Sequence, residues 1–431
     1  MPLYTASRVP DFQIMKKIII LFLCCILLTS CVHENNDTIS PERMKKMPYS
    51  SVIPIVNQTE NTEKNVYEPL NYDIQKAVWI SYIDLASNLT GKTESEFRYN
   101  FKKMCKNVSE LGCNTIYLHL RPFGDAIYNS EIYPASRYIT GVAEQYADFD
   151  PLEIMLEIAH NYDLSVHGWI NPLRCETKET IMNYSGDYLI KDWLNEGDGK
   201  ICEVEGDEHL WLNPAFEEVR QLIAEGAKEI AENYDIDGIH FDDYFYPTTD
   251  ESFDDQCYSE DCGKSLSEWR TQNISLMVKE IYDEVKSVDS DILVGVSPQG
   301  NMENNYDYMY ADVKTWCSGY GYIDYIVPQI YFGYENSVKP FELTVEEWQN
   351  IITDDNIKLI VGLGVYKISD ENESEFVENQ GIIANQIEDC LDTFDCKGFA
   401  LYNYINLFEP SENSSIRANA EVECIKKALN R

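Results

Sequence analysis

The stretch Asp235-Ile-Asp-Gly-Ile-His-Phe-Asp-Asp-Tyr-Phe-Tyr-Pro247 decides the fold class and locates the candidate site. It follows an amphipathic helical pattern and is typical of a short buried strand that ends in two carboxylates and several aromatic residues. Because side chains alternate between the two faces of a strand, we expect His240 and Asp242 to point inward in a barrel. Active sites of parallel α/β barrels lie at the carboxyl ends of the strands. Asp242 is therefore the predicted acidic residue of a site, and Asp243 begins the loop. The alternative is an Asp pair that only caps a turn.

Short β-rich runs alternate with helical patterns from Gln75 onward, which is typical of βα units around a parallel sheet. Eight strands are predicted, the number that a closed barrel needs, at 77–82, 115–121, 165–171, 238–242, 292–297, 325–329, 359–364 and 398–402. Helices are predicted between them at 94–111, 151–162, 214–233, 265–287, 344–353, 382–393 and 414–429. The strand count favours a (β/α)8 TIM-type barrel over an open doubly wound sheet, as does the lack of a Gly-x-Gly-x-x-Gly turn.

The predicted barrel is a single α/β domain that covers residues 73–431 and has long βα loops. The helix 214–233 is expected to begin at Pro214, with Asn213 as its cap. Two βα connections are long, 171–213 and 243–263. In this fold, long loops at the carboxyl face build substrate sites.

Residues 1–31 resemble an export signal. Met15-Lys-Lys precedes a short apolar run at 18–28, and Leu28-Thr-Ser-Cys31 resembles a bacterial lipobox. The run is too short for a comfortable membrane span. We expect Met15 to be the true start, and Cys31 to carry a lipid that anchors the protein to the outer face of the bacterial cell membrane. A signal anchor without lipid is the alternative. Residues 32–72 are polar and are expected to form a flexible tether.

Charge and cysteine spacing narrow the possible partners. The formal net charge of −40 argues against nucleic acid and against bulk attraction to anionic membranes or wall polymers. The close pairs Cys257/Cys262 and Cys390/Cys396 would form disulfides in an oxidising compartment or stay free thiols in an anaerobe. No Cys-x-x-Cys or Cys/His spacing supports a zinc site, so neither a metal nor a cofactor is predicted.

Polar and aromatic side chains lie at or near the ends of several predicted strands. Because these ends meet at one rim, we expect the side chains to form one site. Carboxylates, amides and guanidinium groups bind sugar hydroxyls, and aromatic rings stack on sugar faces, so the mix is typical of a carbohydrate site. The predicted substrate-binding residues are Arg121, His167, Trp169, Asn171, Arg174, His240, Tyr244, Gln299, Gln329, Tyr331, Tyr402 and Asn403. Among the inward histidines, His119 is expected to lie deep, and His167 and His240 nearer the rim.

Glycoside hydrolysis commonly needs two carboxyl groups, one on each side of the scissile bond. Asp242 is the first predicted catalytic residue. The second stays open: Asp243 and Asp125 are the leading candidates, ahead of Glu335 and Asp84. A surface glycan-binding lipoprotein without catalysis is an alternative, because no Glu ends the fourth or seventh strand. A weaker alternative is a metal-dependent hydrolase that uses Asp242, Asp243, His240 and His167.

Seven stretches carry a likeness to a known family: Ala77-Val-Trp-Ile-Ser-Tyr82, Gly112-Cys-Asn-Thr-Ile-Tyr-Leu-His-Leu-Arg-Pro122, Asp150-Pro-Leu-Glu153, Val166-His-Gly-Trp-Ile-Asn-Pro172, Trp211-Leu-Asn-Pro214, Asp237-Gly-Ile-His-Phe-Asp-Asp-Tyr244 and Tyr325-Ile-Val-Pro-Gln-Ile-Tyr331. Together they resemble the glycosyl-hydrolase-like family 10, exported bacterial proteins that are often lipoproteins and have a glycosidase-type barrel. The resemblance covers about residues 75–410. It implies hydrolysis of glycans such as peptidoglycan freed of its peptides. It implies a catalytic role for Asp242, and sugar-binding roles for Arg121, His167, Trp169, Asn171, His240 and Gln329. Asp125-Ala126 fits the family pattern loosely, so the resemblance does not fix the acid/base.

Overall fold

A computed structural model of the protein describes residues 67–430, apart from the side chain of Asp261. All of these residues fall within one compact unit. The predicted start at Met15, the lipidation of Cys31 and most of the predicted tether lie outside the described residues. Across the described range, no helix is both long enough and apolar enough to cross a membrane.

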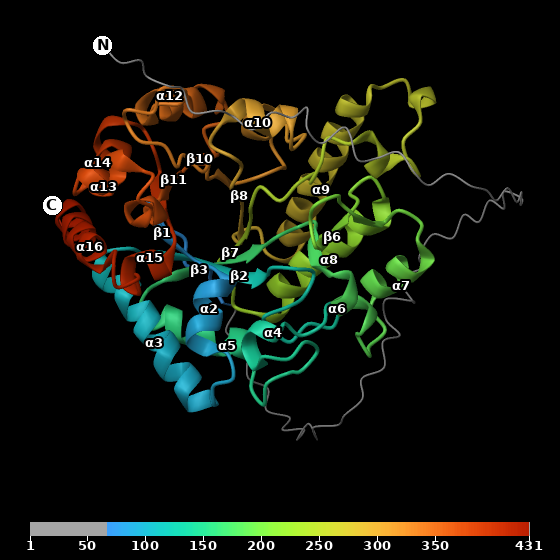
Figure 1. Ribbon diagram of the computed structural model, residues 1–431, viewed down its shortest axis with the longest axis horizontal. Coiled ribbons are helices and arrows are strands. Elements are labelled where there is room, and N and C mark those ends of the chain that lie inside the picture. The colour runs from blue at the N-terminus through green and yellow to red at the C-terminus, as the bar shows by residue number, and fades with distance from the viewer. Residues whose placement is uncertain (1–66, 431) are drawn as a thin grey trace, which may run out of the picture. The chain divides into compact units, whose positions relative to one another are not determined.

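The core of the domain is a parallel α/β barrel, which confirms the predicted fold class (Figure 1). Nine described strands pair in the order β10-β9-β8-β7-β3-β2-β1-β12-β11. They are β1 (Gln75–Ile80), β2 (Thr115–Arg121), β3 (Ser165–Ile170), β7 (Gly238–Phe241), β8 (Leu293–Val296), β9 (Tyr325–Ile326), β10 (Lys358–Leu359), β11 (Val361–Gly364) and β12 (Gly398–Tyr402).

The seventh predicted strand is present as two short pieces, β10 and β11, on either side of Ile360. β10 pairs with β9, and β11 pairs with β12. The N–H of Ile360 donates to the carbonyl of Ile326 at 2.9 Å, and that of Gly362 donates to Pro328 at 3.0 Å. The interrupted strand therefore has neighbours on both sides and closes the barrel.

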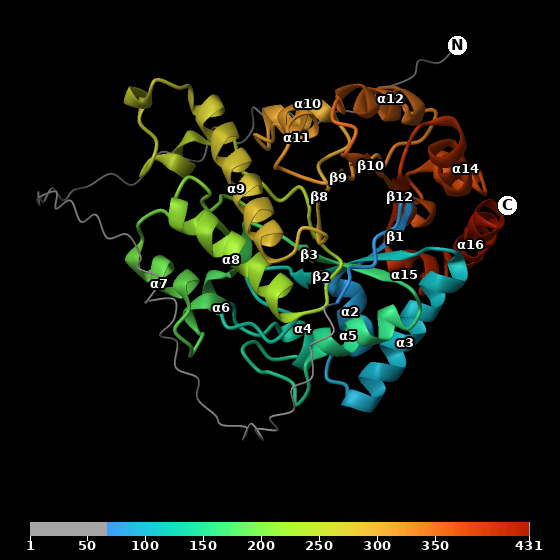
Figure 2. The same ribbon diagram turned by 180° about the vertical axis from the view of Figure 1, so that it is seen from behind.

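Helices surround the strands, as Figures 1 and 2 show. The helices that match predicted ones are α3 (Glu94–Leu111), α5 (Pro151–His160), α8 (Glu217–Asn233), α9 (Leu266–Val288), α12 (Phe341–Ile351), α14 (Ile382–Glu388) and α16 (Ser415–Leu429). Shorter ones that were not predicted are α2 (Tyr82–Leu89), α4 (Arg137–Thr140), α6 (Lys178–Met182), α7 (Leu189–Glu196), α10 (Met302–Asp307), α11 (Val313–Ser318), α13 (Ser374–Glu378) and α15 (Tyr404–Phe408). Single helical turns cover Glu251–Asp254, Glu260–Cys262 and Val365–Ser369, and a π-helical turn covers Asp389–Thr393.

The predicted start of α8 is wrong by almost one turn. The helix begins at Glu217, and Phe216 is its cap residue, without a side-chain capping bond. Asn213 instead accepts the N–H of Ala215 on its side-chain oxygen at 3.0 Å, and its carbonyl accepts the N–H of Phe216 at 3.3 Å. The pattern that suggested a cap therefore forms a turn that precedes the helix.

The inside of the barrel is filled by stacked aromatic rings and histidines. His240 points inward as predicted: its ring stacks on Tyr117 with 4.2 Å between centroids, and it accepts the Trp79 indole N–H at 3.3 Å. The predicted depth of the other two histidines is wrong. β3 pairs His167 with Gly238, the first residue of β7, whereas His119 is level with Trp169 one layer higher. His167 lies in this lower layer, 2.6 Å from the Tyr325 hydroxyl, and burial lowers its pKa to about 4.

The segment just before β1 packs on the amino end of the barrel. Asp237 is fully buried and accepts hydrogen bonds from the Tyr67 hydroxyl at 2.6 Å and from the N–H of Leu70 at 2.5 Å. It also accepts the N–H of Val166 at 2.6 Å and lies 3.0 Å from His160. The packed part of the chain therefore includes residues from Tyr67 onward, which the sequence had assigned to the tether.

The long connection after β3 folds into a small antiparallel sheet, which the sequence did not predict. Its strands are β4 (Arg174–Thr177), β5 (Ile201–Glu203) and β6 (His209–Leu212), in the order β4-β6-β5. Because β4 begins at Arg174, directly after the rim of the barrel, this sheet holds Arg174 beside the candidate site.

The described cysteines are all free thiols. Neither Cys257/Cys262 nor Cys390/Cys396 forms a disulfide here, although the thiols of the second pair lie within hydrogen-bonding reach of each other.

Candidate active site

Two neighbouring carboxyl groups, Asp242 and Asp243, lie directly after β7 at the carboxyl end of the barrel. Asp242 is only 4% exposed and accepts the Trp169 indole N–H at 3.0 Å and the backbone N–H of Tyr244 at 3.3 Å. Asp243 is less deeply buried and accepts the side-chain N–H of Gln329 at 3.1 Å. The barrel therefore brings Asp242, Asp243, Trp169, Tyr244 and Gln329 together, as the sequence predicted.

Burial raises the pKa of Asp242 well above the ordinary value of an aspartate, and the charge of Asp243 raises it further. The N–H donors Tyr244 and Trp169 and the charge of Arg174 act in the opposite direction. Burial also raises the pKa of Asp243. Two neighbouring carboxyl groups with raised pKa values keep a proton at a pH where an exposed aspartate has lost it. One of them can therefore act as an acid at a pH above the ordinary range of an aspartate.

Two glutamine amides hold Asp243. Gln329 and Gln299 each form a side-chain hydrogen bond that lowers the pKa of Asp243. The Gln329 amide also donates to the carbonyl of Ser297 at 3.1 Å, and the Gln299 oxygen accepts the Asn304 amide at 3.1 Å. These contacts fix the orientation of both amides, so that their N–H groups face the carboxylate.

Half-buried tyrosines surround the pair. Tyr402 stacks on Tyr331 with 5.8 Å between ring centroids and packs on Trp79 at 5.9 Å. Tyr366 completes this group with edge contacts to Tyr331 and Tyr402 at 5.8 and 6.2 Å. On the other side, Tyr82 packs against Tyr138 at 4.7 Å. Rings of this kind are suited to stack on the apolar faces of sugars.

Arg174 lies between two aromatic rings at the edge of the site. Its guanidinium carbon is 4.9 Å from the centroid of Phe123 and 5.0 Å from that of Tyr244, and it donates to the Tyr244 hydroxyl at 3.4 Å. His209 and Trp211 of β6 support this stack, since His209 packs on Phe123 and Trp211 packs on Tyr244. Neither residue was predicted as part of the site. The stretch Trp211-Leu-Asn-Pro214 is one of those that resemble the family, and it was the available signal for Trp211.

The predicted orientation of Arg121 is wrong. The pairing of β2 with β3 shifts between His119 and Arg121, and such a bulge re-aims the side chain that follows it. Arg121 is 1% exposed, stacks on the Tyr133 ring at 4.7 Å and contacts the side of α8 at Gly226. It therefore lies behind the strand rather than at the rim.

Asn171 and Asn403 are also more deeply placed than expected. The Asn171 amide donates to the carbonyl of Pro122 at 3.0 Å, and the Asn403 amide donates to Asp84 at 3.0 Å. The two asparagines are 2% and 5% exposed. The hydrogen bonds of both side-chain amides go to other groups of the protein and hold the loops of the rim.

The remaining candidate carboxylates have contacts of their own. Asp84 accepts the backbone N–H of Ser81 in the capping box of α2, and burial raises the pKa of Asp84 to about 6. Asp125 is 2% exposed and accepts the N–H of Phe123 at 2.9 Å, and burial followed by the charge of Glu176 raises its pKa to about 6. Glu335 is exposed on the loop after β9. None of the hydrogen bonds of these three described residues reaches Asp242 or Asp243.

A metal-dependent site finds no support in this arrangement. His167 is held by Tyr325 in the lower layer of the barrel, so the structure does not bring it to the aspartates. Within residues 67–430, no group of three or more His, Cys, Asp or Glu side chains is arranged to hold a metal ion.

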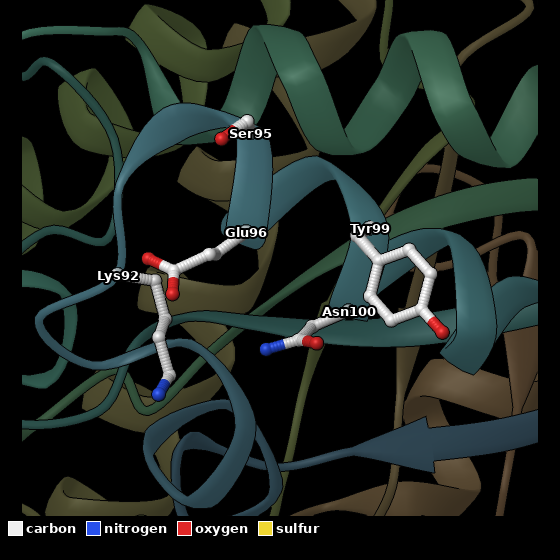
Figure 3. Close-up of a pocket in the computed structure, with 5 residues that line it drawn as sticks. All are labelled: Lys92, Ser95, Glu96, Tyr99 and Asn100. Atoms are coloured by element: carbon white, nitrogen blue, oxygen red, sulfur yellow. The ribbon is translucent and has the colours of Figure 1, made fainter.

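A hollow opens beside the start of α3, and Figure 3 shows the residues that line it. It has a volume of about 350 Å³ and is lined by Lys92, Ser95, Glu96, Tyr99 and Asn100 at the start of α3. The Glu96 carboxylate already accepts the backbone N–H of Thr93 at 3.0 Å in the capping box of α3. The carboxylate in this hollow therefore serves to cap α3.

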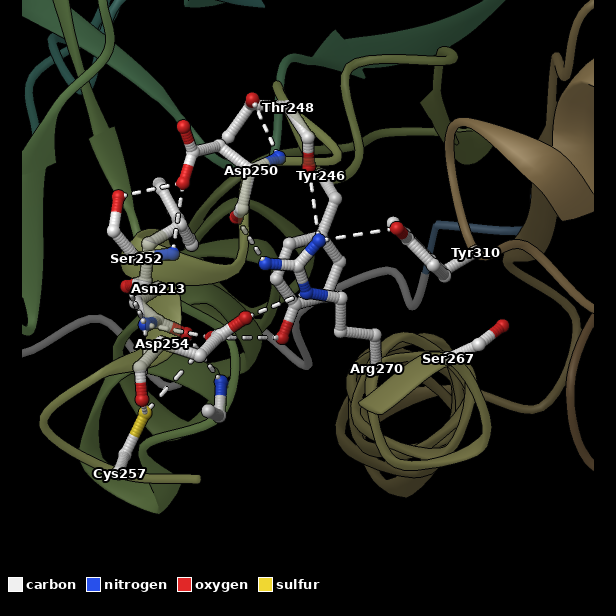
Figure 4. Close-up of polar contacts among 12 residues, drawn as sticks. Asn213, Tyr246, Thr248, Asp250, Ser252, Asp254, Cys257, Ser267, Arg270 and Tyr310 are labelled. Atoms are coloured by element: carbon white, nitrogen blue, oxygen red, sulfur yellow. Dashed lines mark hydrogen bonds and ion pairs between the residues drawn. The ribbon is translucent and has the colours of Figure 1, made fainter. Parts of the chain in front are cut away.

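The loop between β7 and α9 is held by a buried ion pair (Figure 4). Arg270 donates to Asp254 at 2.6 Å, and both side chains are fully buried. Arg270 also donates to the carbonyls of Thr248 and Asp250 at 3.1 and 2.6 Å, and it lies 5.0 Å from the ring centroid of Tyr246. Because the loop begins at the aspartate pair, these contacts fix the chain that leaves the site.

Taken together, the barrel and its rim define a glycosidase-type protein, in which buried acids lie among tyrosine and tryptophan rings at the carboxyl end of an α/β barrel. The profile of the glycosyl hydrolase-like 10 family matches residues 75–379, and the chain belongs to this family.

Two curated relatives carry related names. The chain is 32% identical to the glycosyl hydrolase YngK of Bacillus subtilis over 322 residues, which cover 68% of this chain and 61% of that protein. It is 26% identical to the glycosyl hydrolase DigH of Escherichia coli K12 over 401 residues, which cover 84% of this chain and 86% of that protein.

Solved structures agree with the fold. An endo-1,4-beta-mannanase from Rhizomucor miehei has a TM-score of 0.51 at 14% identity and covers 83% of this chain and 95% of its own. The catalytic domain of a beta-amylase from Paenibacillus polymyxa has a TM-score of 0.51 at 14% identity and covers 82% and 97%. At this identity the likeness concerns the fold alone.

Replacing Arg270 tests the role of the ion pair. Arg270→Met leaves Asp254 buried without its partner, so we expect the free energy of unfolding to fall by about 3–5 kcal/mol. Arg98→Met is the matched control, because Arg98 forms only surface ion pairs and should cost about 0–1 kcal/mol. Urea denaturation followed by circular dichroism measures both. Equal losses for the two variants would contradict the anchoring role of Arg270.

Proposed function

We propose that this protein is a glycoside hydrolase in which Asp242 and Asp243 carry the acid chemistry. The observation that carries the proposal is the pair itself, two buried carboxyl groups with raised pKa values at the carboxyl end of the barrel. The tyrosines at the rim supply surfaces for sugar rings. Membership in a glycosyl hydrolase-like family, with relatives named glycosyl hydrolases, supports the same reading.

The proposed substrate is a bacterial surface glycan, in the first place peptidoglycan strands from which the peptides have been removed. The export signal and lipobox that end at Cys31 support an extracytoplasmic location. In this proposal the acylated Cys31 anchors the protein to the outer face of the cell membrane. A net charge of −40 disfavours densely anionic wall polymers as substrates.

In the proposed reaction, one carboxyl group of the pair protonates the oxygen of the leaving sugar. That proton has to be present when the substrate binds, which requires a raised pKa. The bond that breaks joins the anomeric carbon to this oxygen, and water finally takes its place. Trp169 and Gln329 each donate an N–H to one carboxylate and so keep the two groups in place.

Asp242→Asn should abolish release of reducing ends from peptide-free glycan strands, because the pair loses a titratable group. The fall should be at least about 1000-fold, as is typical when a catalytic group is removed. Asp255→Asn is the control, since Asp255 is an exposed carboxylate of the same loop and should leave activity unchanged. Circular dichroism and strand binding should be the same for both variants.

Normal turnover by Asp242→Asn would contradict the assignment. Binding of strands without release of reducing ends by the unmodified protein would instead favour a surface glycan-binding lipoprotein.

The pH profile provides a second test. Because the protonated pair is the active form, kcat/KM should fall as the pH rises through the raised pKa. The alkaline limb of the pH profile should therefore lie well above pH 3.8, the ordinary pKa of an aspartate. Trp169→Phe removes an N–H that lowers the pKa of Asp242 and should move this limb to higher pH. Trp211→Phe removes an N–H that reaches Asp207 instead and should leave the limb in place. A limb that shifts to lower pH in Trp169→Phe would contradict the account.

A further inference from the structure

Asp242 and Asp243 are neighbours in sequence, so both carboxyl groups reach a bound sugar from the end of the same strand, β7. The common mechanism of glycosidases needs one group beside the leaving oxygen and a second on the opposite side of the sugar ring. Two adjacent residues at one strand end are poorly placed to stand on both sides of the scissile bond.

The hydrogen bonds of the other candidate carboxylates do not place them opposite the pair. Asp84 caps α2 and accepts the Asn403 amide, and Asp125 accepts the N–H of Phe123 in its own loop. The charges that act most strongly on Asp242 belong to Asp243 and Arg174. Within residues 67–430, no hydrogen bond of Asp84 or Asp125 therefore joins these carboxylates to the pair.

Apart from Arg174, the groups that contact the pair are neutral hydrogen-bonding groups and rings. Trp169 donates to Asp242, and the Gln329 amide bridges Asp243 and the carbonyl of Ser297. The Ser297 hydroxyl is 1% exposed and has no hydrogen-bond partner among residues 67–430. Such surroundings suit a neutral amide of a ligand, which offers one N–H donor and one carbonyl acceptor.

We propose that the substrate supplies its own nucleophile, the carbonyl oxygen of a 2-acetamido group on the sugar whose bond is cleaved. The inference rests on the proposed glycosidase function and adds the identity of the nucleophile in the cleavage of 2-acetamido-2-deoxy glycosides, the sugars of the proposed substrate. One aspartate protonates the leaving oxygen, and the other accepts the N–H of the acetamido group.

The step balances within the complex. The acetamido oxygen forms a bond to the anomeric carbon while the bond from that carbon to the leaving oxygen breaks, and the leaving oxygen takes the proton of the first aspartate. The second aspartate stabilises the positive charge that develops on the amide. Water then attacks the anomeric carbon and gives a proton back to the first aspartate. At the same time the bond between the anomeric carbon and the acetamido oxygen breaks. Two displacements at one carbon give retention of configuration.

The test compares one glycan with two acyl groups. Peptide-free strands are N-deacetylated and then re-acylated, one batch with acetyl groups and one with trifluoroacetyl groups. The fluorines withdraw electrons from the carbonyl oxygen with little change in size. If this oxygen is the nucleophile, the full-length protein should hydrolyse the trifluoroacetyl strands at least about tenfold more slowly, which is about 1.4 kcal/mol in the barrier. The product formed first should have the anomeric configuration of the substrate, as followed by nuclear magnetic resonance.

The outcomes separate the two proposals. Slower cleavage of the trifluoroacetyl strands together with retention supports the inference. Equal rates on both batches, or inversion, would overturn the inference and leave the glycosidase function standing. Cleavage of a glycan without acetamido groups but not of the re-acetylated strands would also overturn it. Failure to cleave any glycan would overturn the proposed function itself.

Discussion

The burial of two neighbouring carboxyl groups at the end of β7 is the constraint on which the site depends. A charged carboxylate is costly to bury, so a buried pair is stable only with hydrogen-bond donors and with one of the two groups protonated. The barrel supplies the donors from three different strand ends: Trp169 from β3, Gln329 after β9 and the N–H of Tyr244 after β7 itself. Without Asp242, the Trp169 indole N–H and the Tyr244 N–H would lose the carboxylate that accepts them.

The loops of the rim keep this arrangement in place from outside the barrel. The sheet β4-β6-β5 holds Arg174 against Tyr244, and the ion pair of Arg270 with Asp254 fixes the chain that follows. In both places a guanidinium group packs against aromatic rings and forms hydrogen bonds with neighbouring groups. The two long connections are therefore built as fixed walls of the site.

The sequence predicted those features that follow from local pattern. Alternation placed His240 and Asp242 on the inner face of β7, and the run of βα units predicted the barrel. Features that depend on pairing between distant segments were missed. A bulge in β2 turns Arg121 away from the rim, and the register of β3 with β7 sets His167 low in the barrel. The small sheet that carries Arg174 and the packing of Tyr67 on Asp237 arise only when the chain is folded.

The central claim is that the aspartate pair is the place where a glycan is bound and cleaved. A crystal structure of the Asp242→Asn variant with a bound peptide-free oligosaccharide tests this most directly. The account predicts a glycosidic oxygen within hydrogen-bond distance of Asp243 or of the side chain at position 242, with sugar rings against Trp169, Tyr331 or Tyr402. An oligosaccharide bound only elsewhere, for example in the hollow beside Tyr99, with no sugar near the pair, would contradict it.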